Sequence, residues 1–217
     1  MFKVSCLSAA VEQIPDGASL MVGGFMGIGS PHRLIDELVR QGKRDLTVIT
    51  NDTARPGCAV GKLVDAKALR RLVTSHIGLN PETQKQMIAG DIEVDLVPQG
   101  TLAERIRAGG TGLGGVLTRT GVGTVVADGK RTVDVDGETF LLERPLVADV
   151  SLIHAWRADH LGNLQYELTA RNFNPAMAMA GGLVIAEAGE IVPVGVIPPD
   201  HVETVSVVVD ILVSRES

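Results

Sequence analysis

The residues with the clearest potential for chemistry form a glycine-rich segment near the N-terminus. Four of its seven residues are glycine, and the segment consists of Gly23, Gly24, Phe25, Met26, Gly27, Ile28 and Gly29. Ser30 and Pro31 follow as the predicted N-cap and first residue of a helix. A glycine turn between a strand and a helix start gathers backbone N–H groups at the positive end of a helix dipole, which favours a phosphate or carboxylate. The alternative is a tight turn that only lets strand and helix pack closely.

Three polar residues that follow predicted strands could complete a binding site. Gln99 comes just after the predicted strand 94–97, and Asn51 and Asp52 come directly after the predicted strand 46–50. Ligands of open α/β sheets bind beyond the carboxyl ends of the strands. An uncharged amide donor such as Gln99 suits a carbonyl oxygen that gains negative charge during acyl transfer. Each residue alone is an ordinary turn residue, but together they predict a pocket for a carboxylate or thioester, without an obvious nucleophile.

Several other binding and catalytic motifs are excluded, because the residues they require do not occur at the required spacing. A dinucleotide fingerprint read from Gly27 has His32 where its third glycine belongs, and a phosphate-binding P-loop needs a lysine that first occurs at Lys43. The five histidines have no metal-ligand spacing, and there is no G-x-S-x-G nucleophile motif. We therefore expect no metal site.

Composition narrows the class of protein. The chain has 217 residues, of which 45% are hydrophobic and 3% aromatic, and a net charge of −6. Without a run of Lys or Arg, this charge argues against a nucleic-acid partner. Cys6 and Cys58 have neither a zinc nor a C-x-x-C spacing, so they are expected to be free, buried thiols in a reducing compartment. No stretch is predicted to span a membrane, and we expect a cytoplasmic protein.

The elements that must position these residues alternate between strands and helices, which is typical of an open, mainly parallel α/β sheet flanked by helices. Short apolar, often β-branched runs predict the strands, at 19–23, 46–50, 69–75, 94–97, 150–155, 183–187 and 205–212.

Three helices are predicted between the strands, each with its own boundary signals. The first has an apolar face and ends before Gly42. The second spans 81–89, between Asn80 and Gly90. The third opens with a capping box over 101–104.

The middle of the chain departs from this alternation. Residues 109–123 contain seven glycines, and Asp136 and Gly137 between alternating runs predict a hairpin turn. We expect a glycine-rich antiparallel insertion at about 109–142. A flexible linker is the alternative, although the apolar residues among the glycines argue for packing.

Several of these motifs resemble the α subunit of the class I, heteromeric CoA-transferases, a family with an α/β/α fold. The residues that carry the resemblance are 22–29, 97–107 and 170–174. Residues 75–78 and 80–83 place it closest to the members that use acetate and acetoacetate. The resemblance covers essentially the whole chain, so we expect a single domain over 1–217.

The resemblance implies a two-part active site. In this family a glutamate on the β subunit forms a glutamyl-CoA intermediate, and Asn51 looks like its α counterpart. The segment Gly23 to Gly29 would bind CoA or line its thioester end, with Gln99 stabilising the oxyanion and Asn51 and Asp52 near the substrate. Glu187 superficially mimics the nucleophile's motif but lies near the C-terminus, and Arg119 stands where the family usually has proline.

The implied protein is one half of an enzyme. It moves CoA between acetyl-CoA, or another acyl-CoA, and a short-chain carboxylate such as acetoacetate. Coenzyme A is a substrate, no cofactor is bound permanently, and the β subunit completes an α2β2 assembly. Two alternatives stay open: a 3-oxoadipate or 3-oxoacid CoA-transferase α subunit using succinyl-CoA, and a non-catalytic anion-binding sensor of the same fold.

Overall fold

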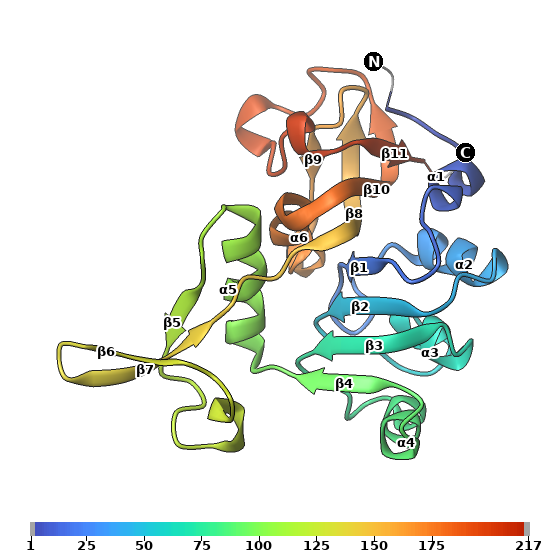
Figure 1. Ribbon diagram of the computed structural model, residues 1–217. Helices are drawn as coiled ribbons and strands as arrows, with labels where there is room; N and C mark the ends of the chain where they lie inside the picture. The colour runs from blue at the N-terminus through green and yellow to red at the C-terminus, as the bar shows by residue number, and fades with distance from the viewer. Residues whose placement is uncertain (1–2, 215–217) are drawn as a thin grey trace.

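One large sheet organises the protein (Figure 1), whose computed structural model describes residues 3–214. The strands of this sheet are β1 (Ser19–Val22), β2 (Leu46–Thr50), β3 (Leu69–Thr74), β4 (Glu93–Leu96), β8 (Ala148–Asp159), β9 (Leu164–Gln165), β10 (Gly181–Val192) and β11 (Ile211–Val213). Their order is β11-β10-β8-β1-β2-β3-β4, with β9 beside β8. Among the described strands of this sheet only the β8–β9 pair is antiparallel. The predicted open, mainly parallel sheet is therefore confirmed.

Helices cover both faces of the sheet. The helices are α1 (Leu7–Glu12), α2 (His32–Arg40), α3 (Val60–Asp65), α4 (Pro81–Ala89), α5 (Gln99–Gly110) and α6 (Asn174–Ala180). On one face, Val48 packs in a core with Leu34 of α2. On the other, Ile49 packs with Leu102 of α5 and Met177 of α6. Neighbouring residues of β2 thus face opposite cores, as strand geometry requires.

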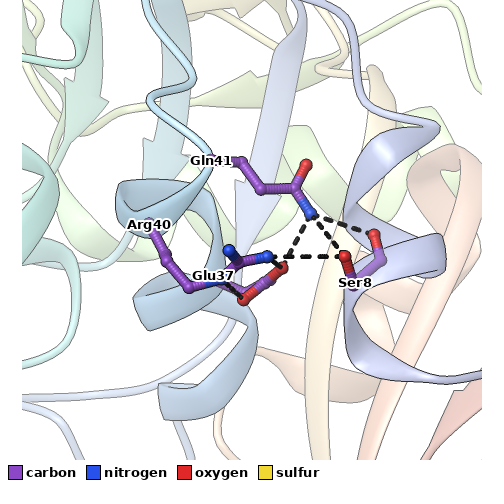
Figure 2. A network of polar contacts seen from close by, with 4 residues as sticks. All are labelled: Ser8, Glu37, Arg40 and Gln41. Carbon is purple, nitrogen blue, oxygen red and sulfur yellow. Dashed lines mark hydrogen bonds and ion pairs between the residues drawn. The ribbon is translucent and has the colours of Figure 1, made fainter.

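A polar network fixes the C-terminal end of α2 against α1 (Figure 2). Arg40 donates two hydrogen bonds of 2.6 Å to the carboxylate of Glu37. The Gln41 amide donates to Glu37 at 2.7 Å and to the Ser8 carbonyl oxygen at 3.0 Å. The hydrogen bond from Arg40 is the main cause that lowers the pKa of Glu37 to about 2. Glu37 therefore accepts these hydrogen bonds as a carboxylate, and its contact with Gln41 helps to hold α2 against α1.

The central segment forms a separate antiparallel sheet that projects from the α5 side of the molecule (Figure 1). It consists of β5 (Val116–Thr118), β6 (Thr132–Val135) and β7 (Glu138–Glu143), in the order β5-β7-β6. Asp136 and Gly137 have φ of 51° and 82°, which suits the tight hairpin turn between β6 and β7. The predicted antiparallel insertion is confirmed, although α5 continues to Gly110 before it begins.

The predicted strand 205–212 is wrong over most of its length. Residues Ser206–Val208 form a short 3₁₀ helix, and β11 begins only at Ile211. Val205 and Val207 are 51% and 83% exposed, and Val209 packs in the core from a segment that is not paired as a strand. Pairing with β10 starts where Ile211 lies opposite Ile185. A strand needs such a partner as well as suitable residues.

The helix starts divide into one that the sequence predicts and two that it does not. Asn80 caps α4 as predicted, accepting hydrogen bonds from Glu82 N at 3.1 Å and Thr83 N at 3.2 Å. Thr101 does not cap α5, because the helix begins two residues earlier and turns the Thr101 side chain into the interior. Ser30 does not cap α2 either: the N-cap position is Pro31, with no side-chain cap of its own.

Candidate active site

Polar side chains meet beyond the carboxyl ends of β2, β3 and β4. The Gln99 amide donates to Asn51 Oδ1 at 2.6 Å, and the Asn51 amide donates to Asp52 Oδ2 at 2.6 Å. The Ser75 hydroxyl donates to the backbone oxygen of Asn51 at 2.7 Å. The structure thus brings together the three polar residues that the sequence predicted. Because a side-chain amide has two N–H donors, Gln99 keeps one beyond its bond to Asn51.

The glycine-rich segment folds as a small hairpin on this edge of the sheet. Phe25 and Ile28 exchange two backbone hydrogen bonds of 2.9 Å. Asp52 Oδ2 accepts from Met26 N at 2.9 Å, which links the hairpin to the polar residues after β2. A Cβ on Gly24 would lie 1.9 Å from Ser30 Oγ, and Gly24 has φ of 121°. Both its conformation and its neighbours therefore require glycine at this position.

The start of α2 is already occupied by a carboxylate of the protein itself. Glu187 Oε2 accepts hydrogen bonds from Arg33 N at 2.9 Å and Leu34 N at 3.0 Å. Burial raises the pKa of Glu187, against the lowering effect of these two N–H groups and of the charges on Arg33 and His32. The expectation that a ligand anion binds at this helix start is therefore corrected, because Glu187 takes the N–H groups that such an anion would use.

The segment that follows β9 holds the hairpin from the other side. Asn172 accepts from Gly24 N at 3.1 Å and donates to the Ile28 oxygen at 3.0 Å, so one side chain spans both arms. Asn174 donates to the Gly29 oxygen at 2.9 Å. Residues 170–174 matched a family motif in the sequence, but no pattern of spacing assigned these two asparagines a role.

Two cavities open beside Phe25 and Gln99, which line both. One has a volume of about 380 Å³ and is also lined by Met26, Asn51, Asp52, Ser75, His76 and Leu79. The other has a volume of about 350 Å³ and is also lined by Gly100, Ala103, Asn172, Phe173 and Ala176. The first offers polar side chains and the second mainly apolar ones. The sequence assigned no role to Ser75, His76 or Phe173. Ser75 and His76 directly follow β3, and Phe173 directly precedes α6.

Within residues 3–214, no cluster of three or more His, Cys, Asp or Glu side chains could hold a metal ion. Cys6 and Cys58 are free thiols, but the prediction that both are buried is wrong, because Cys6 is exposed and Cys58 is only half-buried. None of the helices described is both long and apolar enough to cross a membrane.

Comparison with known proteins identifies the family. The family model described as Coenzyme A transferase matches residues 4–215. The chain belongs to the coenzyme A transferase family. It is 54% identical to the alpha subunit of the acetate CoA-transferase of Escherichia coli K12, over 99% of this chain and 98% of that one. It is also 49% identical to a subunit of the succinyl-CoA:3-ketoacid coenzyme A transferase of Xanthomonas campestris, over 95% of this chain and 85% of that one.

Solved structures share the fold of this coenzyme A transferase chain. An acyl-CoA transferase of Escherichia coli O157:H7 superposes with a TM-score of 0.87 at 23% identity. The match covers 99% of this chain and 47% of that one, so the present chain spans about half the length of that protein.

Proposed function

We propose that this chain is the α subunit of a heteromeric CoA-transferase that moves CoA between acetyl-CoA, or another acyl-CoA, and a short-chain carboxylate such as acetoacetate. The observation that carries the proposal is the position of Gln99. Its amide donates to Asn51 at 2.6 Å and borders two cavities with apolar linings, of which one also contains the polar side chains of Asn51, Asp52 and Ser75. A thioester bound there would have its polar carbonyl beside the Gln99 amide and its apolar substituents against the apolar lining.

In this proposal the chain supplies electrostatic stabilisation and the partner supplies the nucleophile. A glutamate of the β partner attacks the thioester carbonyl, whose oxygen then gains negative charge. The free N–H of Gln99 donates to that oxygen, and its bond to Asn51 fixes the donor before reaction. Near the hairpin, the Asp52 carboxylate accepts hydrogen bonds from Met26 N and the Asn51 amide, and Glu187 accepts from the start of α2.

The glycine-rich hairpin lines the thioester end of CoA in the same proposal. Phe25 and Met26, 43% and 39% exposed, present apolar surface at the cavities, and Ile28 is 55% exposed on the same hairpin. Gly23, Gly24 and Gly27 allow the hairpin to pack closely against neighbouring side chains, and Gly29 allows it to approach the Ala170 backbone. Asn51 and Asp52 border the carboxylate substrate and orient Gln99 and Met26.

The proposed assembly is an α2β2 complex in the cytoplasm. The name of the Escherichia coli relative, an alpha subunit, implies a β partner, and free Cys6 and Cys58 agree with a reducing compartment. Coenzyme A enters only as part of the substrate. A 3-oxoacid CoA-transferase using succinyl-CoA is the second candidate, supported by the Xanthomonas relative at 49% identity.

Mixing experiments test the proposal. The purified chain alone should transfer no CoA from acetyl-CoA to acetoacetate, and addition of its β subunit should restore transfer. Parallel assays with succinyl-CoA distinguish the two candidate substrates. Robust transfer by the isolated chain, abolished by Glu187→Ala, would overturn the division of roles between the subunits.

A further inference from the structure

The buried acid Glu187 has no part in the proposed reaction. Glu187 lies in β10 and is 6% exposed, and it lines neither of the two cavities beside Gln99. It shares the register of His154 in β8 and of Val213 in β11. A buried carboxyl group is costly unless its oxygens have partners, so its contacts indicate what it does.

Those contacts are with the start of α2. The first N–H groups of a helix have no partner within the helix, and a local side chain usually accepts from them. Here Pro31 is the N-cap and offers none, while Glu187, far away in the sequence, accepts from Arg33 N and Leu34 N at 2.9 and 3.0 Å. The position of the first turn of α2 is therefore tied to β10.

The same turn reaches the tip of the glycine-rich hairpin. His32, the first residue of α2, has Nε2 2.8 Å from the Gly27 oxygen. A carbonyl oxygen can only accept, so Nε2 carries the hydrogen and donates it. A continuous set of contacts thus runs from β10 through the start of α2 to Gly27.

We propose that Glu187 and His32 are positioning residues for the glycine-rich hairpin: Glu187 fixes the start of α2, and His32, carried on that turn, fixes the Gly27 carbonyl. Phe25 and Met26, which line the cavities, are held in place as a result. The effect on catalysis rests on the proposed function, whereas the effect on the hairpin does not.

Hydrogen exchange of the backbone amides of Phe25 and Ile28 tests the positioning directly. The measurement uses the full chain, first by itself and then mixed with its β subunit. His32→Phe keeps a ring but loses the donor, and it should speed exchange at both amides at least fivefold. His32→Gln can place an amide donor near the original Nε2 and should return exchange to within twofold of the parent. Unchanged exchange in His32→Phe would overturn the proposal.

Glu187 is tested in the same way with a matched control. Glu187→Leu should speed exchange at these amides, whereas Glu187→Gln keeps an acceptor for the helix start and should preserve most of the protection. The control is Glu37→Gln, which weakens the other end of α2. If it speeds exchange at Phe25 and Ile28 as much as Glu187→Leu does, the effect is general destabilisation and the proposal fails.

Kinetics of the assembled enzyme then separate this inference from the proposed function. His32→Phe should lower kcat/KM for acetyl-CoA about fivefold, the scale of one lost hydrogen bond, and His32→Gln should restore it. Faster exchange with unchanged kcat/KM would confirm the positioning and remove the hairpin from the proposed site. Unchanged exchange with lowered kcat/KM would overturn the positioning and leave the site intact.

Discussion

The two ends of α2 are each held by a glutamate that is 6% exposed, but the two carboxyl groups are opposites chemically. Glu37, near the C-terminal end, pairs with Arg40, which lowers its pKa to about 2. Glu187 accepts from two backbone N–H groups at the N-terminal end, and burial raises its pKa. The pKa of a buried acid therefore does not follow from its exposed fraction alone, because it also depends on the groups that contact the carboxyl group.

The two ends of α2 also differ in their relation to the candidate active site. The C-terminal end, with Ser8 and Gln41, packs α2 on α1 and lies away from both cavities. The N-terminal end touches the glycine-rich hairpin through His32. We expect changes near the hairpin to alter kinetics and changes at the far end to alter only stability.

The largest effect is expected from Gln99→Ala in the assembled enzyme. Loss of one donor to a developing oxyanion lowers kcat by roughly 10²-fold. Because Gln99 is an exposed residue at the cavity edge, the melting temperature should change little. Steady-state kinetics beside a thermal melt check both expectations, and an unchanged kcat would mean that Gln99 only supports Asn51.

Glycines on either side of α2 offer a second test. Gly24 and Gly42 both have positive φ, of 121° and 68°, but an added Cβ at Gly42 meets nothing within 4 Å. Gly42→Ala should therefore cost roughly 1 kcal/mol of unfolding free energy, from backbone conformation alone. Gly24→Ala must also displace Ser30 and should cost roughly 2 kcal/mol. Urea unfolding measures both, and equal losses would contradict the packing argument.

Much of this arrangement could be predicted from the sequence, because it depends on local signals. Asn80 caps α4 and Asp136-Gly137 turns a hairpin through residues adjacent in the chain. The start of α2 could not be predicted in this way, because its cap comes from Glu187 across the sheet. Asn172 was missed for the same reason, since its contact with Gly24 joins segments 148 residues apart.

At the far end of α2, Glu37→Gln should lower stability without changing the kinetics. The loss should be roughly 1 kcal/mol, since Arg40 is largely exposed and water screens the pair. The parent's stability from this pair is fully present above the ordinary pKa of 4.5 and is lost as pH falls toward about 2. Urea unfolding across that range should show the acid loss in the parent and a shallower loss in Glu37→Gln. A changed kcat in this variant would contradict the division along α2.

The smallest expected effect is the pH dependence of stability that comes from Glu187. Its sign is opposite to that of the pH dependence from Glu37. Its pKa is raised on folding above the ordinary value of 4.5, so the folded protein binds its proton more tightly than the unfolded chain. Stability from this group is therefore fully present below pH 4.5 and declines as pH rises through the folded pKa. Glu187→Gln does not titrate and should remove that decline, while Glu37→Gln should leave it in place. Urea unfolding of both variants at pH values above 4.5 makes the measurement. A decline that persists in Glu187→Gln would assign it to another group and leave the Glu187 carboxylate as a cap without a titration of its own.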